Sequence, residues 1–409
     1  MRGMRPLGGL VGANILAQGI AAGGAIAVAR IYGPAAVGGA AVILGVAGVA
    51  SIVITLRLDS ILPFVSDGRD SASLVRLMAL NSVVGSAMLG AFGMLPSWGD
   101  RFGAGPLLAL ASLGMSLQAL YLAVLTRQRD YRLMAGRTVL VSGGIVVLQL
   151  VSSMFQAGVT ALVLSDAAAR ASAGLSIRRA LRASVVGGSI AYRNIASLLR
   201  KYLPQVAWLV PSSLLDALGT QLPLILVGWV YGPGNAGLYA LSARFLSVPV
   251  ALIGTAAGNF LRGEYSVDSR RSASERLSLY RQVQRLLVVL ATLMVVGVVL
   301  IAPWIIDSLL GPQWQGAKEI ISVLVLGAAV NLLWNPVSAL LIARGRERLF
   351  FSVIAVRLSL VLLGAATAQA VDGGILLAVA LMTGGQALAE MGGVLIVRSG
   401  LRSWLGLSD

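Results

Sequence analysis

The sequence predicts an all-α polytopic membrane protein of about twelve transmembrane helices, and three observations lead to this fold class. The 409 residues have a mean hydropathy of +0.86 and are 57% hydrophobic, while only 12% are charged. The apolar residues gather in stretches of roughly 20, the length that spans a bilayer as a helix. The basic residues gather in short segments between those stretches. This composition does not fit a soluble fold.

The expected spans fall into a first and a second set of six. In chain order they are residues 7–29, 36–65, 74–95, 105–126, 137–155, 159–177, 204–230, 235–260, 286–306, 319–342, 349–370 and 374–397. The first apolar run is longer than the core of a typical signal peptide, so we expect a retained helix there. The connections are too short for a separate soluble domain, which argues against a membrane-tethered enzyme.

The distribution of basic residues predicts the orientation. If the N-terminus is cytoplasmic, 25 of the 32 lysines and arginines lie in cytoplasmic segments, three lie on the other side and four lie inside spans. This positive-inside pattern predicts that both termini are cytoplasmic. It also accounts for the net charge of +16 through contact with anionic lipid headgroups, without a nucleic-acid partner.

The chain contains neither cysteine nor histidine. This excludes disulfides, thiol nucleophiles and histidine acid–base catalysis, and it argues against most zinc and haem sites. We expect no metal, no cofactor and no catalytic residue, which argues against an enzyme.

An internal repeat predicts two lobes. Tyr32-Gly33-Pro34 recurs as Tyr231-Gly232-Pro233, and Ser71-Ala72-Ser73 recurs as Ser272-Ala273-Ser274, at nearly equal offsets. We expect an N-terminal six-helix lobe (1–177), a basic cytoplasmic linker (178–203) and a C-terminal six-helix lobe with a short tail (204–409). Because six is even, the two lobes would be related by a pseudo-two-fold axis along the membrane normal.

The first helix of each lobe carries a polar stripe. Asn14 and Gln18 lie one turn apart on the first span, and Ser212, Asp216 and Thr220 follow at four-residue spacing on the seventh. We expect both stripes to face the interface between the lobes rather than lipid.

Two arginines lie deep in predicted spans, Arg244 in the eighth and Arg357 in the eleventh. Neither has an acidic residue three or four positions away, so a local ion pair does not explain them. They predict either a cavity that binds an anion or pairing with another helix.

Other charges inside the spans have local explanations. Asp166 and Arg170, at i and i+4, are expected to neutralise each other. Arg57 and Asp59 differ by two positions and are expected to point to different faces of a long second helix, where snorkelling to the interface is an alternative. For Glu390, and for Asp216 on its stripe, proton or cation coupling and an interhelical hydrogen bond both remain open.

At this point the chain resembles the bacterial lipid-linked oligosaccharide flippases, of the O-antigen and exopolysaccharide translocase type, in the multidrug/oligosaccharidyl-lipid/polysaccharide exporter superfamily. The resemblance covers essentially the whole chain. It rests on the ordered motifs Ala29 to Pro34, Thr55 to Asp59, Gly237 to Arg244 with Pro249, and Gly311 to Ala317. Family members often have an aromatic residue and then Glu where this chain has Leu58 and Asp59.

The resemblance implies flipping of undecaprenyl-diphosphate-linked oligosaccharide repeat units from the cytoplasmic to the periplasmic leaflet of the bacterial inner membrane, by alternating access. Membrane lipids would surround the protein, and a polysaccharide polymerase and assembly proteins are further candidate partners. In this interpretation the diphosphate is bound by Arg30, Arg57, Arg244 and Arg357, and the cavity is lined or coupled by Asn14, Gln18, Asp59, Asp216 and Glu390. The alternatives are a drug or cation antiporter of the same superfamily and a non-transporting scaffold of a polysaccharide assembly complex.

Overall fold

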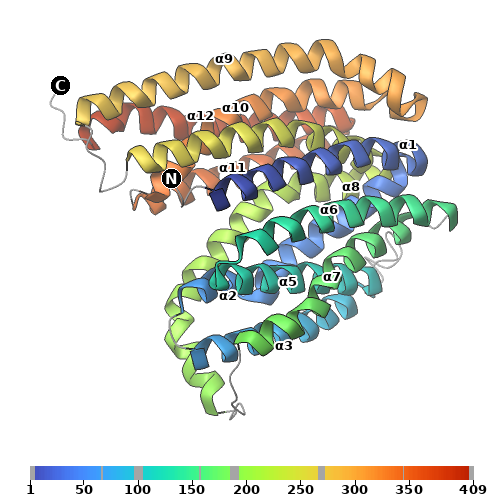
Figure 1. The fold of residues 1–409 in the computed structure, drawn as a ribbon. Coiled ribbons are helices and arrows are strands. Elements are labelled where there is room, and N and C mark those ends of the chain that lie inside the picture. The colour runs from blue at the N-terminus through green and yellow to red at the C-terminus, as the bar shows by residue number, and fades with distance from the viewer. Residues whose placement is uncertain are drawn as a thin grey trace. The chain divides into compact units, whose positions relative to one another are not determined.

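The computed structural model describes residues 5–65, 68–95, 105–155, 158–184, 193–265, 272–343 and 345–404, and all of its regular elements in these ranges are helices (Figure 1). By its internal contacts the chain forms two compact units, Met1–Gly228 and Trp229–Asp409. The expected linker lies partly outside the described residues, and the lobe boundaries taken from the repeat remain a prediction.

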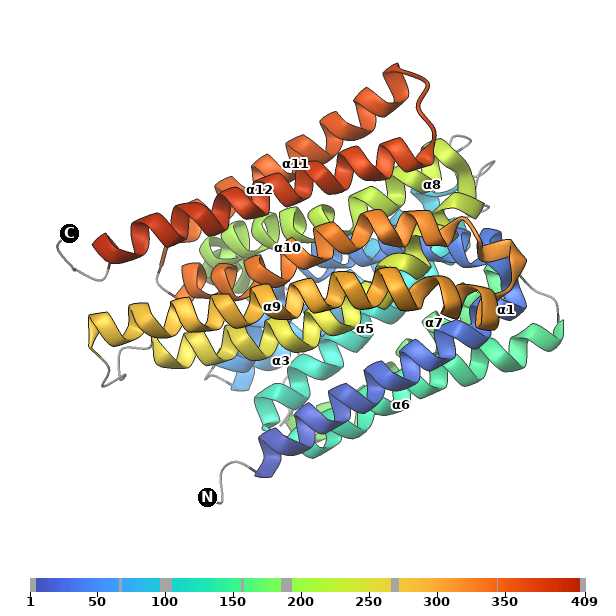
Figure 2. The same cartoon turned by 90° about the horizontal axis from the view of Figure 1, so that it is seen from above.

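The first unit is built from long helices with short breaks. Its elements are α1 (Arg5–Thr55), α2 (Leu58–Ile61), η1 (Leu62–Phe64), α3 (Gly68–Phe92), α5 (Gly105–Gln128), α6 (Tyr131–Ser152), η2 (Ser153–Phe155), α7 (Gly158–Ser184) and the part of α8 (Arg193–Glu264) up to Gly228. Within it, α1 lies along α6, as Figure 2 shows, and α5 packs against both α3 and α7.

The second unit begins within α8, at Trp229. It continues with α9 (Ala273–Ile305), η3 (Ile306–Leu310), η4 (Pro312–Trp314), α10 (Ala317–Ala343), α11 (Glu347–Ala370) and α12 (Ile375–Trp404). In this unit α10 packs against α9 and α12, and α11 runs beside α12 (Figure 2).

Within the described ranges, nine helices are long and apolar enough to cross a membrane. Two of them, in α1 and α8, cover 40 and 65 residues, about 60 and 100 Å of helix against a hydrocarbon thickness of about 30 Å. Each therefore has the length of two expected spans. The expected sixth span, in α7, is a helix but is not among the nine, and the count of twelve remains a prediction.

The repeated Tyr-Gly-Pro motif forms the same kink in both units. Gly33 has φ 74° and ψ 171°, and Gly232 has φ 85° and ψ 170°, a backbone conformation that is essentially limited to glycine. The following proline cannot donate to the helical ladder, so each long helix bends there. The hydroxyl of Tyr32 donates to the carbonyl of Gln149 (2.8 Å), and that of Tyr231 donates to the carbonyl of Gly373 (3.0 Å).

Replacing Gly232 by alanine is expected to destabilise the protein by about 1–3 kcal/mol, because a Cβ is strained at this positive φ. Gly234 is the matched control, since an added Cβ meets open space at both positions but only Gly232 has the positive φ. Gly234→Ala should be neutral or slightly stabilising. Thermal midpoints in detergent measure both, and equal midpoints for the two variants would contradict the assignment of a strained kink.

Helix α9 begins earlier than its hydropathy predicts. We expected the apolar span to start at 286, but α9 starts at Ala273, directly after the Ser272 N-cap. Ser272 Oγ accepts from the Glu275 N–H (3.3 Å), and a Glu275 carboxylate oxygen accepts from the Ser272 N–H (2.7 Å). This capping box stabilises three polar turns before the apolar part begins.

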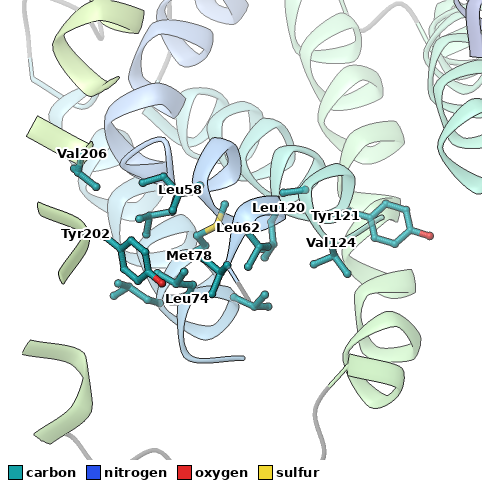
Figure 3. Close-up of a cluster of buried hydrophobic side chains, with 14 of the residues drawn as sticks. Leu58, Leu62, Leu74, Met78, Leu120, Tyr121, Val124, Tyr202 and Val206 are labelled. Carbon is teal, nitrogen blue, oxygen red and sulfur yellow. The ribbon is translucent and has the colours of Figure 1, made fainter. Parts of the chain in front are cut away.

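Each unit has its own apolar core. In the first unit a cluster that includes Leu58, Leu62, Met78 and Leu120 joins the break after α1 to α3 and α5 (Figure 3). Tyr202, near the start of α8, is buried in the same cluster, so the beginning of α8 is fixed to the first unit. Many large apolar side chains remain exposed, as expected for surfaces that face lipid; Leu300 is 71% exposed.

Candidate functional site

A buried polar cluster joins three helices of the second unit. Arg357 on α11 is 4% exposed and Glu390 on α12 is fully buried, and Arg357 Nη1 lies 3.2 Å from Glu390 Oε1. The same carboxylate oxygen accepts from Asn331 Nδ2 on α10 (2.9 Å) and from Gln386 Nε2 (3.2 Å). Three donors thus converge on one carboxylate oxygen in the core of the unit.

The sequence left two explanations open for Arg357, and the structure shows the pairing with another helix. Sequence reasoning missed the partners because Glu390 is 33 positions away in the chain. Only the contact between Gln386 and Glu390 is indicated by local sequence, through their four-residue spacing on one helix. Contact of Arg357 with a transported anion remains a prediction, and its burial in an ion pair weighs against it.

The second expected span is interrupted where Arg57 lies. Leu56 and Arg57 both have positive φ, 51° and 52°, so the chain leaves the helix between α1 and α2. Arg57 Nη1 reaches Asp59 at 3.4 Å, with the side chains 32% and 18% exposed. The expectation that these two residues point to different faces was therefore wrong, because it assumed a continuous helix.

Arg127 at the end of α5 contacts the chain beyond this interruption, at η1 and the residue after it. Its guanidinium donates to the carbonyls of Leu62 (3.4 Å) and Val65. These backbone carbonyls lie at the end of η1, where the helical ladder stops and a donor is needed. This contact was not predicted, since Arg127 lies in an expected cytoplasmic loop and was interpreted only as a loop charge.

The pair Asp166 and Arg170 is confirmed as self-neutralising. Arg170 donates through Nε to one Asp166 oxygen (2.6 Å) and through Nη2 to the other (3.1 Å). Its third nitrogen, Nη1, donates to Gln118 Oε1 on α5 (2.8 Å). This bidentate geometry satisfies both charges on the face of α7 that packs against α5.

Arg30 and Arg244 differ from these residues because their side chains are exposed. Arg30 lies on α1 three residues before the Gly33 kink. Arg244 lies on α8, twelve residues after Gly232 and twenty before the end of the helix, and thus well inside an apolar segment. An exposed guanidinium at such a depth is rare and needs an anion, water or a polar neighbour.

The polar stripes are only partly described. Asp216 is exposed, and the hydroxyls of Ser212 and Thr220 donate to backbone carbonyls of their own helix, at 2.8 and 2.9 Å. Gln18 is half-buried, while the side chain of Asn14 lies outside the described residues. The structure therefore brings together Arg357 with Glu390 and Arg57 with Asp59 among the expected site residues, and the roles expected for the whole set remain predictions.

The comparisons with known proteins agree on fold and family. A family model described as polysaccharide biosynthesis protein matches residues 27–319. The teichuronic acid biosynthesis protein TuaB of Bacillus subtilis (strain 168) is 27% identical over 150 residues, which cover 36% of this chain. The aligned part is 30% of the length of that relative.

Two solved transporter structures share the fold. The lipid II flippase MurJ in an inward closed conformation aligns with a TM-score of 0.73 over 96% of this chain and 86% of that one, at 14% identity. A multidrug resistance MATE family transporter in an inward-facing conformation aligns with a TM-score of 0.61 over 96% and 94%, also at 14% identity. At this identity the likeness shows the fold alone. Because the family model covers well over half of the sequence, this multi-pass membrane protein belongs to the polysaccharide biosynthesis protein family.

Proposed function

We propose that this protein flips undecaprenyl-diphosphate-linked oligosaccharide repeat units from the cytoplasmic to the periplasmic leaflet of the bacterial inner membrane by alternating access. The polymer would be an O-antigen or another exported polysaccharide. The family and the transporter fold support a flippase or transporter in polysaccharide biosynthesis. The substrate, the direction and the membrane are our proposal.

The distribution of charge inside the spans supports an anionic cargo. Asp59, Asp166 and Glu390 each form an ion pair with an arginine of their own unit. Arg244 is an exposed arginine in the middle of an apolar span. A guanidinium forms paired hydrogen bonds with phosphate oxygens, so an exposed arginine at this depth offsets part of the cost of dehydrating a diphosphate.

The same observation separates this proposal from the drug or cation antiporter. A site for a cationic drug requires carboxylates or aromatic faces toward the cargo. Asp59, Asp166 and Glu390, inside the expected spans, are instead engaged by arginines. The likeness to the MATE transporter does not decide between the two functions, because it concerns the fold.

Loss of the protein is expected to leave lipid-linked repeat units on the cytoplasmic face and to abolish the mature polymer. Extraction of polyprenyl-diphosphate saccharides from the deletion strain, with polymer measured in parallel, tests this. A deletion that changes drug sensitivity and leaves the polymer at its normal level would contradict the flippase function and support the antiporter function.

A further inference from the structure

One face of α9 carries two adjacent surface grooves. Residues along this face follow at three- or four-residue spacing from Ser274 to Val296, so they form one stripe. The first groove, of about 340 Å³, is lined among the described residues by Ser274, Leu277, Ser278, Arg281, Gln282 and Arg285. The second, of about 280 Å³, continues along the same helix and lies on its seam with α10. Polar and basic groups thus give way to apolar ones along a single line.

The second groove is shaped by small side chains at the seam. Its α9 side includes Val288 and Val296, and its α10 side includes Ala329, Val330 and Leu333. Ala291 is buried at this seam, while Leu287 and Leu332 are buried in the cluster that joins the two helices. The groove is therefore part of a packed helix pair, seen side by side in Figures 1 and 2.

The first groove is positively charged. Arg281 and Arg285 are exposed and lie one turn apart, about 6 Å between their Cβ atoms. The described residues that line this groove include no acid. Glu275, the nearest acid along α9, is engaged in the capping box with Ser272. From Arg285 to Val296 the helix rises about 17 Å, and the second groove follows the basic pair over the nine residues from Val288 to Val296.

These features match one kind of lipid. A glycerophospholipid has one phosphate and two chains, whereas a polyprenyl diphosphate has two phosphates and a single chain. Two arginines one turn apart match two adjacent phosphates, and a single helix seam matches one chain. We propose that the α9–α10 seam is a docking site for the polyprenyl diphosphate carrier. The diphosphate lies on Arg281 and Arg285, and the first isoprene units lie between Val288 and Leu333.

This proposal rests on the function proposed above and gives the carrier lipid a place on the surface of the second unit. Arg244, which lies on α8, is not among the residues that line the two grooves. The end of α9 that carries Arg281 and Arg285 is the end that the charge distribution predicts to be cytoplasmic. The carrier would therefore dock from the leaflet in which the lipid-linked saccharide is assembled.

Photolabelling of the full chain in lipid nanodiscs tests the site. The probe is a polyprenyl diphosphate with a diazirine in its chain, and a phosphatidylglycerol with a diazirine in one acyl chain is compared with it. We expect the diphosphate probe to label peptides from 286–300 and 327–334. Arg281→Gln combined with Arg285→Gln should lower this labelling about tenfold, as expected for loss of two charge-assisted contacts, while Arg348→Gln, an exposed arginine on α11, should leave it unchanged.

A second pair of variants tests the apolar groove. Thr292→Trp fills the groove, whereas Leu293→Trp, at an exposed neighbour that does not line it, is the matched control. Only the first should lower labelling. Equal labelling by the phosphatidylglycerol probe, or diphosphate labelling mapped to other helices, would overturn the docking site and leave the proposed function standing. An absence of saturable labelling by the diphosphate probe anywhere on the chain would count against both.

Discussion

Replacing Glu390 alone by alanine is expected to remove most of the folded protein from the membrane. The substitution leaves Arg357 in the core of the second unit without its carboxylate and removes the acceptor for Asn331 and Gln386. Breaking a buried pair in this way costs about 3–5 kcal/mol. The measurements are the yield of monodisperse protein after detergent extraction and its thermal midpoint.

The double substitution Arg357→Met with Glu390→Leu is the control for this prediction. Removing both charges leaves no orphan charge, although Asn331 and Gln386 still lose their acceptor, and buried pairs replaced by apolar residues of similar size are often as stable as the original. We therefore expect the double variant to recover most of the folded protein. A fully stable Glu390→Ala variant would contradict the structural role of the pair. A well-folded double variant that exports no polymer would show that the pair also acts in transport.

Arg244→Ala is expected to abolish export while the protein still inserts and folds. The side chain is exposed, so its removal creates no cavity, and we expect the main effect to be loss of the proposed contact with the cargo phosphate. We expect at least about a tenfold loss of export, and partial rescue by Arg244→Lys, which keeps the charge and loses the bidentate geometry. Polymer export is normalised to the amount of membrane-inserted protein.

Arg262 provides the comparison for Arg244. It is also an exposed arginine of α8 but lies in the last turn, at the end predicted to be cytoplasmic. Arg262→Ala should export normally. Full export by the Arg244→Ala variant would remove this residue from the cargo site, and an equal loss in both variants would assign the effect to the general charge of α8.

The sequence predicted the features that depend on composition and on local spacing. The apolar stretches correspond to helices because an unsatisfied backbone cannot cross a membrane. The Asp166–Arg170 pair was predictable because its two members lie one helical turn apart. The repeat of Tyr-Gly-Pro was visible in the sequence, and both copies form the same kink.

The features that depend on packing between helices were not predictable. Nothing near Arg357 in the chain indicates Glu390, because the pair forms only when α11 lies against α12. The hydrogen bond from Arg127 to the Leu62 carbonyl was missed because it depends on the break after α1, and the sequence shows Arg127 only as a charge in an expected loop. Hydropathy predicts one continuous apolar helix through this region, so the break at Leu56 and Arg57 was not predicted. The early start of α9 was missed because hydropathy detects apolar residues and not helix caps.

Reconstitution tests the central claim most directly. The purified protein is placed in liposomes that contain a polyprenyl-diphosphate oligosaccharide in both leaflets, and an impermeant saccharide-modifying enzyme is added outside. With the wild-type protein we predict that the protected inner pool becomes accessible over time, and that it stays protected with the Arg244→Ala variant and in protein-free liposomes. Equal protection in all three preparations, from protein that is folded and inserted, would contradict the assignment of this chain as a flippase for lipid-linked saccharides.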